Sequence, residues 1–300
     1  MLFRSADQAL VPNLNVNDPV WRGVLRDVRF RRALSLATNR HEINQVIYYG
    51  LGIEGNNTAL PGSPVYSEDF RTRWARYDIR AANALLDEMG LTKRDHRGIR
   101  LLPDGRPMKI VVETAGESTE QMDILELVHD TWLDLGIKIY PKALQRDVLR
   151  NRVFAGETVM CIWFGAEFAL MDSDANPRDF VVHEQQQLQW PKWGQYRETK
   201  GKSGEPVDMP EAKELQTLEQ AWSKTADRDV RRAIWRRILE INADQQFTIG
   251  IVAGAFQPVV IATALKNLPE QGIFNWDPGA QFGMYRPDTL YFSPADVASR

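Results

Sequence analysis

The sequence predicts an α/β fold, because short apolar strands alternate with helix-periodic stretches along the middle of the chain. Residues 109–113 are predicted to form a strand, residues 118–135 a long helix and residues 137–140 a second strand. A strand, a helix and a strand in this order form a right-handed βαβ unit with parallel strands. A short helix at residues 148–154 and the apolar strand at residues 158–164 repeat the pattern.

The composition is that of a globular protein. The 300 residues are 43% hydrophobic and 26% charged, enough for one large domain or two smaller ones. The 37 Lys and Arg residues nearly balance the 40 Asp and Glu residues, which indicates neither a nucleic-acid-binding surface nor a basic membrane-seeking one. Cys161 is the single cysteine and lies in an apolar run, so we expect a buried side chain without a disulfide.

Two short helices are predicted within residues 25–52. Four apolar residues recur at helical spacing in the first: Phe30, Ala33, Leu34 and Ala37. Asn39 is a natural N-cap of the second helix, and Glu42, three residues on, can complete a capping box. Gly50 is expected to end this helix in the left-handed conformation. Three apolar residues form its stripe: Ile43, Val46 and Ile47.

The long central helix is predicted to begin at Ser118, with Gln121 as its capping-box partner, and to end at Gly136. Five residues form its apolar stripe: Met122, Leu125, Val128, Trp132 and Leu135. From Met209 the chain turns helical again, and the polar break at residues 225–229 predicts an antiparallel helix pair. We interpret the arginines of the second helix as a solvated face: Arg231, Arg232, Arg236 and Arg237. Two β-rich runs follow, at residues 247–252 and 258–262.

No catalytic or metal-binding pattern occurs in the sequence. The four histidines have no metal-ligand spacing, and there is no nucleophile elbow and no phosphate-binding loop. Asp172 and Asp174 could pair as acid and base, but two carboxylates in a proline-containing loop are more often turn and capping residues. The sequence therefore predicts neither an enzyme nor a bound cofactor or metal.

The predicted ligand-binding region is residues 163–196. It begins where the most apolar strand ends, which is the edge where open α/β sheets bind their ligands. Its aromatic rings suit peptide side chains or the faces of sugars, although some of them could simply fill the core. The candidate ligand-binding residues are Trp163, Phe164, Glu167, Asp172, Asp174, Trp190 and Trp193.

Several segments, taken in their order along the chain, resemble the family 5 extracellular solute-binding proteins, which are the peptide-binding subunits of ABC importers. Residues 25–52 are similar to the start of the C-terminal lobe in that family. Further family-like segments are residues 15–20 (NVNDPV), 78–91 (DIRAANALLDEMGL), 101–114 (LLPDGRPMKIVVET), 132–137 (WLDLGI), 266–270 (KNLPE) and 286–292.

This resemblance implies a periplasmic-binding-protein-like type II (cluster C) lobe, with a mixed sheet flanked by helices. Residues 20–250 would form the C-terminal lobe, and residues 1–19 and 251–300 would be the hinge segments that join an N-terminal lobe. Family members are longer and are exported, so we expect a fragment of a periplasmic or extracellular protein. Residues 1–20 have no signal-peptide pattern, and no stretch is apolar enough to span a membrane.

The function implied by the resemblance is reversible capture of peptides between two lobes and their delivery to the subunits of an ABC permease. In such binders an acidic residue before an Asn-Pro element pairs with the ligand ammonium group, and Asp172 or Asp174 is the nearest match. An extra stretch, residues 167–174, departs from the family spacing. An oligosaccharide ligand and an unrecognised hydrolase are the alternatives. We expect no nucleic-acid partner, a peripheral position at the membrane, and a hinge edge open to self-association.

Overall fold

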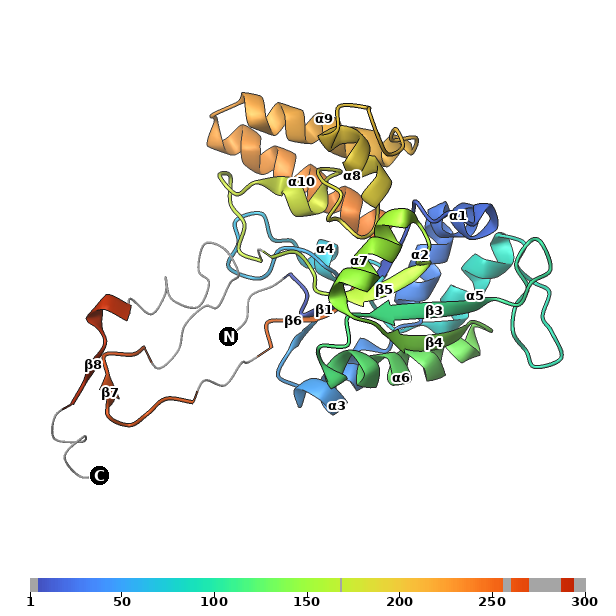
Figure 1. Ribbon diagram of the computed structural model, residues 1–300, viewed down its shortest axis with the longest axis horizontal. Helices are drawn as coiled ribbons and strands as arrows, with labels where there is room; N and C mark the ends of the chain where they lie inside the picture. Colours follow the sequence, from blue (N-terminus) through green and yellow to red (C-terminus); the bar gives the residue numbers. More distant parts are fainter. Residues whose placement is uncertain (1–4, 168, 256–259, 270–286, 294–300) are drawn as a thin grey trace.

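The computed structural model describes residues 5–167, 169–255, 260–269 and 287–293. Within these ranges the chain forms a six-stranded sheet with helices on both faces and, apart from it, a two-stranded sheet (Figure 1). This arrangement confirms the predicted α/β class. The strands are β1 (Gln8–Pro12), β2 (Ile53–Glu54), β3 (Lys109–Thr114), β4 (Lys138–Ala143), β5 (Met160–Trp163), β6 (Ile249–Ala253), β7 (Leu265–Lys266) and β8 (Tyr291–Phe292).

The large sheet is mixed, with the strand order β2-β6-β1-β5-β3-β4. Strands β3, β4 and β5 are parallel, as the βαβ pattern predicted, whereas β1 is antiparallel to both of its neighbours, β5 and β6. Residues 8–12 of the predicted hinge segment therefore form a central strand of the sheet. This strand, β1, lies between β5 and β6 and so joins residues 160–163 to residues 249–253.

Helices cover the sheet in groups that Figure 1 separates clearly. Helices α3 and α6 lie below the sheet, α7 lies over β5, and α8, α9 and α10 form a group above them. The helices are α1 (Pro19–Arg26), α2 (Val28–Leu36), α3 (Arg40–Tyr48), α4 (Glu68–Thr72), α5 (Ile79–Glu88), α6 (Thr119–Asp134), α7 (Arg146–Ala155), α8 (Pro191–Glu198), α9 (Pro210–Lys224) and α10 (Arg228–Gln245), with the 3₁₀-helices η1 (Pro177–Phe180) and η2 (Pro287–Thr289). No helix of the described ranges is long and apolar enough to cross a membrane.

Most of the predicted apolar stripes face the core. In α6 the side chains of Leu125, Val128 and Trp132 are buried, as is that of the C-cap residue Leu135, and Met122 is partly buried. In α3 the prediction was wrong for Val46, whose side chain is 56% exposed. A nine-residue helix that packs along a single stripe buries only part of any predicted apolar face. The run at residues 258–262 extends outside the described residues, and residues 260–262 are not in a strand.

The predicted caps form only in part. Asn39 accepts a hydrogen bond from the Glu42 backbone N–H, but Glu42 accepts from the Asn39 side chain instead of closing the box on its backbone. The first left-handed residue after α3 is Tyr49, followed by Gly50. Ser118 caps α6, whereas the Gln121 amide bonds to side chains in β1 and β3. In α3 the Glu42 carboxylate accepts from the Asn39 side chain, and in α6 the Gln121 amide bonds to Gln8 and Thr114. Neither side chain therefore reaches the backbone N–H group that a capping box would satisfy.

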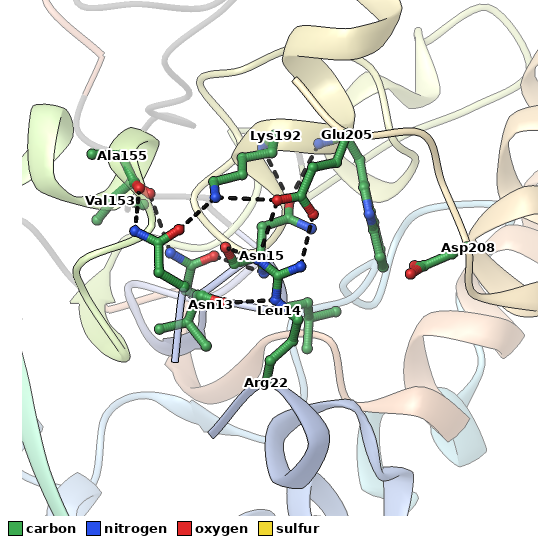
Figure 2. Close-up of polar contacts among 12 residues, drawn as sticks. Asn13, Leu14, Asn15, Arg22, Val153, Ala155, Lys192, Glu205 and Asp208 are labelled. Atoms are coloured by element: carbon green, nitrogen blue, oxygen red, sulfur yellow. Dashed lines mark hydrogen bonds and ion pairs between the residues drawn. The ribbon is translucent and has the colours of Figure 1, made fainter. Parts of the chain in front are cut away.

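An asparagine-rich segment after β1 joins distant parts of the chain (Figure 2). The buried Asn13 amide donates to the carbonyl oxygens of Val153 and Thr158, at 3.2 and 3.1 Å. The Asn15 side chain accepts from the backbone N–H groups of Lys192 and Trp193, at 3.0 and 3.2 Å. Side-chain amides thus bond to backbone groups at the end of α7, in the turn after it and at the start of α8, as buried polar groups require.

Arg22 of α1 reinforces the same segment. Arg22 donates to the carbonyl oxygens of Val16 and Asn15 and pairs with Glu205 at 3.0 Å. Lys192 also bonds to Glu205, at 3.1 Å, so this carboxylate links α1 to the start of α8 (Figure 2). The five donors of an arginine in a fixed fork suit this bridging of several acceptors.

Two further arginines, Arg31 and Arg40, are buried and cap backbone carbonyl groups. Arg31 donates to the carbonyl oxygen of Gln245, and Arg40 donates to that of Gly250, at 2.7 and 2.8 Å. Burial lowers the pKa of both guanidinium groups to about 9. These contacts fasten α2 and α3 to the end of α10 and to β6.

The close approach of residues 56–57 to β6 predicts that Gly250→Ala destabilises the protein. An added Cβ would lie 2.2 Å from the Asn57 backbone nitrogen and 2.5 Å from the Asn56 carbonyl carbon. We expect the free energy of unfolding to fall by about 2 kcal/mol, measured by urea denaturation. Gly23→Ala is the matched control, because its Cβ meets nothing within 4 Å inside α1, and it should raise stability by about 0.5–1 kcal/mol. Equal effects of the two substitutions would contradict this packing.

Candidate functional site

A pocket of about 170 Å³ opens where β5 ends, at the edge that the sequence predicted. It is formed by the end of β5 and the loop after it, with contributions from β1 and from residues before β6. Its lining residues are Val11, Asn57, Arg150, Trp163, Phe164, Gly165, Ala166, Glu167, Asp179, Glu184, Gln186, Gln187, Leu188, Gln189 and Thr248.

Asn57 organises one side of the pocket. Its side-chain oxygen accepts from the Ala166 N–H at 3.0 Å, and its amide nitrogen donates to the Thr248 hydroxyl at 2.9 Å. The neighbouring Gly165 has no room for a side chain, because a Cβ there would lie 2.6 Å from both the Ala6 nitrogen and the Asn57 oxygen. Four chain segments far apart in sequence, at residues 6, 57, 165–166 and 248, are therefore held against each other beside the pocket.

Trp163 and Phe164 form the aromatic part of the lining. Their rings meet edge to face, with centroids 5.6 Å apart. Arg146 and Arg150 of α7 lie over the Trp163 ring, at 5.3 and 5.8 Å from its centroid. Arg146 is also paired with Glu117. The half-buried indole thus stands between a cationic helix and the pocket.

Three carboxylates line the pocket: Glu167, Asp179 and Glu184. Asp179 accepts from the Glu167 N–H at 3.0 Å, and Glu167 pairs with Arg178 at 3.1 Å. Burial raises the pKa of the Asp179 carboxyl, and the negative charge of Glu167 acts in the same direction. This part of the lining can accept hydrogen bonds from a ligand and favours positive charge.

The remaining side of the pocket is a loop that Gln187 holds together. Its side-chain oxygen accepts from the N–H groups of His183 and Glu184 and from the Trp190 indole, at 2.7, 3.1 and 3.0 Å. Its amide nitrogen donates to the carbonyl oxygens of Arg178 and Val181. One amide therefore sets the shape of residues 178–190.

Glu219 of α9 holds the same loop from outside the pocket. Its side chain is buried, His183 Nδ1 lies 2.6 Å from its Oε1, and Arg197 donates to both of its oxygens. Burial opposes ionisation of Glu219, but the hydrogen bonds from His183 and Arg197 outweigh it and lower the pKa of this carboxyl.

Trp163, Phe164 and Glu167 are the candidate residues that the structure brings together in the pocket. Trp190 and Trp193, which were also candidate ligand-binding residues, do not line the pocket, because both side chains are completely buried. Their rings stack on each other with centroids 6.3 Å apart, and Trp190 also meets Phe247 edge to face. These two tryptophans fill the core, where apolar burial is most favourable.

Asp172 and Asp174 also lie away from the pocket. Asp172 accepts two hydrogen bonds from Arg232, which lower its pKa to about 2, and Asp174 accepts one from Arg231 at 3.0 Å. Both carboxylates are thus already paired with α10 and are not part of the pocket lining. Phe168, within the extra stretch, lies outside the described residues. In the part of the chain that is described, no group of three or more His, Cys, Asp and Glu side chains could hold a metal ion.

Several lining residues were not candidates from the sequence. Asn57 and Thr248 lie more than 50 residues from β5 and carry no local signal. Glu184 and Gln187 belong to the polar run EQQQLQ inside the predicted region, and this concentration of amides was the signal that could have identified them. Arg150 stands on a predicted helix, but the direction of its side chain depends on how α7 packs over β5.

Comparison with known proteins identifies the relatives of this chain. The family model described as bacterial extracellular solute-binding proteins, family 5 Middle, matches residues 5–187, more than half of the chain. The dipeptide-binding protein of Escherichia coli (strain K12) is 28% identical over 160 residues, which are 52% of this chain and 28% of that protein.

Solved structures with a similar fold include two binding proteins. The structure of the oligopeptide-binding protein OppA matches with a TM-score of 0.77 and 26% identity, over 97% of this chain and 47% of that one. A periplasmic oligopeptide-binding protein from Thermotoga maritima with bound mannohexaose matches with a TM-score of 0.66 and 18% identity, over 90% of this chain and 48% of that one. This chain therefore spans about half the length of these structures, and the relatives are named as binding proteins, not enzymes.

Removing the carboxylate that holds the pocket loop, by Glu219→Gln, should lower the free energy of unfolding by about 3 kcal/mol at pH 7, because Arg197 loses a buried anionic partner that accepts two of its hydrogen bonds. The lowered pKa of Glu219 means that its stabilisation is present above its ordinary value of 4.5 and is lost as the pH falls through the folded-state value. Urea denaturation should therefore give a difference between variant and parent that shrinks in acid.

The control for this measurement is Glu214→Gln, which removes an exposed carboxylate of the same helix, paired with Arg237. It should change stability by less than about 1 kcal/mol at either pH. A loss for Glu219→Gln that stays the same from pH 7 to about pH 3 would contradict the assignment of the stabilisation to its ionised form.

Proposed function

Because the chain belongs to the family 5 bacterial extracellular solute-binding proteins, we propose that it is one lobe of a substrate-binding component that captures peptides for an ABC importer. The observation that carries the proposal is the pocket at the end of β5, which Trp163 and Phe164 line together with carboxylate and amide side chains. Open α/β sheets bind ligands at this edge. The named relatives include a dipeptide-binding and an oligopeptide-binding protein.

The chemistry of the lining suits a peptide. Trp163 and Phe164 offer apolar surface for a side chain, and the amides of Gln186 and Gln189 in the same lining are groups of the kind that pair with backbone N–H and C=O. Glu167 replaces Asp172 and Asp174 as the candidate partner of the ligand ammonium group, because it lines the pocket and they do not. A carboxylate and an ammonium group form a charge-assisted hydrogen bond that is stronger than a neutral one.

Capture between two lobes accounts for the size of the site. The pocket measures about 170 Å³, whereas ligand pockets are usually about 300–1,000 Å³. A second lobe would supply the remaining contacts, joined through residues 1–19 and 251–300, and would close over the ligand about this hinge. In this proposal the protein works in the periplasm or outside the cell, and its closed form delivers the peptide to the permease subunits.

An oligosaccharide is the second candidate ligand. A half-buried tryptophan beside several amides and carboxylates is also a good surface for a sugar ring and its hydroxyl groups. The Thermotoga maritima protein named above has bound mannohexaose, which supports this candidate.

A thermal-shift screen of peptides beside oligosaccharides, on the two-lobe protein, tests both candidates. We expect peptides with a free N-terminus to stabilise it, and Glu167→Gln to weaken their binding about tenfold through loss of a counter-charge. Binding of N-acetylated peptides should change little. The control is Glu240→Gln, which removes an exposed carboxylate of α10 outside the pocket. Stabilisation by sugars alone would reject the peptide proposal in favour of the second candidate.

The 300-residue chain by itself should bind the same peptides poorly, because half of the proposed contacts would be missing and the ordering cost of binding would remain. Isothermal titration calorimetry should detect no binding tighter than about 1 µM. A dissociation constant of about 1 µM or less would mean that this lobe contains the complete site.

A further inference from the structure

The loop between β5 and η1 has two parts with different surroundings. Its first residues, through Glu167, line the pocket, and Asp179 of η1 lines it again after the loop returns. The residues between them, 169–176, are not in the lining and lie against α9, α10 and the turn at residues 60–63. We name residues 169–176 the clamp segment.

Two carboxylates attach the clamp segment to α10. Arg232 donates from Nε and Nη2 to the two oxygens of Asp172, at 2.8 and 3.1 Å. Arg231 donates to Asp174 at 3.0 Å, and Arg228 lies 3.5 Å from the same carboxylate. The two-point contact of Arg232 fixes direction as well as distance, which a single ion pair does not.

Two indole groups hold the backbone of the clamp segment between these carboxylates. Trp222 Nε1 donates to the Ser173 carbonyl oxygen at 2.8 Å, and Trp235 Nε1 donates to that of Ala175 at 3.0 Å. Ser173 and Trp235 are buried, and Arg231 stacks over Trp222 at 4.7 Å. The contacts alternate between side chain and backbone from Asp172 to Ala175, so this part of the clamp segment is attached to both helices.

Residues on the two sides of the clamp segment are bonded to each other and to α10. The Glu167 N–H donates to Asp179, and Arg178 pairs with Glu167. Asn242 of α10 donates to the Phe180 carbonyl oxygen at 2.9 Å. A shift of the clamp segment would therefore change the separation of Glu167 and Asp179, and through the Arg178 carbonyl it would reach the Gln187 side chain.

We propose that Arg232 is a positioning residue for the ligand pocket, which acts through Asp172 to hold the clamp segment and thereby the pocket lining in one arrangement. This inference rests on the proposed function for its biological meaning, since it concerns the same site. A lining that is ordered before the ligand arrives lowers the ordering cost of binding. Through the extra residues of this loop, helix α10 thus supports the site.

Hydrogen exchange tests the proposal on the 300-residue chain without a ligand. The reporters are the backbone amides of Glu167, His183 and Glu184, whose acceptors are the side chains of Asp179 and Gln187. In Arg232→Gln we expect these three amides, measured by NMR, to exchange about three- to tenfold faster, the range that loss of a two-point ion pair supports.

Arg237→Gln is the matched control, because Arg237 stands on the same helix and pairs with Glu214 and Glu240 instead of the clamp segment. It should leave the three reporters unchanged. Asp172→Asn is a milder second variant that keeps an acceptor for Arg232, so it should give a smaller increase at the same amides. It also keeps the test valid if Arg232→Gln does not fold.

Faster exchange confined to the clamp segment and α10, with the reporters unchanged, would overturn the proposal, because Arg232 would then have only a local structural role. The ligand screen separates this result from a failure of the proposed function. Faster reporter exchange in a protein that no peptide or sugar stabilises would support the coupling and reject the ligand proposal. In a two-lobe protein that does bind, Arg232→Gln should weaken the ligand about three- to tenfold, and Arg237→Gln should not.

Discussion

The central position of β1 is the constraint on which the rest of this structure depends. A strand from the start of the chain lies between β5 and β6, and each of these pairs with it antiparallel. The residues that follow β1 have no partner strand, so Asn13 and Asn15 supply side-chain amides to carbonyl and N–H groups of α7, of its following turn and of α8. These contacts fasten α7 and α8 to the segment that follows the central strand.

The same logic explains where the charges are. Buried or half-buried cations donate to backbone carbonyl groups or to carboxylates that belong to distant elements, as Arg31, Arg40 and Arg232 do. Each guanidinium joins two elements at the cost of its own desolvation, which the number of its hydrogen bonds offsets. Around the pocket, Glu167 and Asp179 have two roles. They line the pocket, and they also hold its lining together, because Asp179 accepts from the Glu167 N–H and Glu167 pairs with Arg178.

Elements that depend on neighbours in sequence were predictable, and contacts between distant residues were not. The βαβ unit of β3, α6 and β4 follows from periodicity, because alternation and helical spacing reflect one buried face. The capping box of Asn39 and Glu42 formed only in part, and Gln121 left its local role for partners in β1 and β3. Local motifs describe what a side chain can do, but tertiary contacts that bury more polar atoms decide what it does.

The sequence by itself determined the class of fold, the βαβ unit of β3, α6 and β4 and the sheet edge at which the pocket opens, because these follow from hydrophobic periodicity and chain direction. It did not predict β1, whose residues were assigned to a hinge segment. The tertiary structure decided which side chains face the pocket. Trp163 lines it, whereas Trp190 enters the core, and Asp172 meets an arginine 60 residues further along the chain. The direction of a side chain depends on packing partners that are distant in sequence, and local spacing contains no record of them.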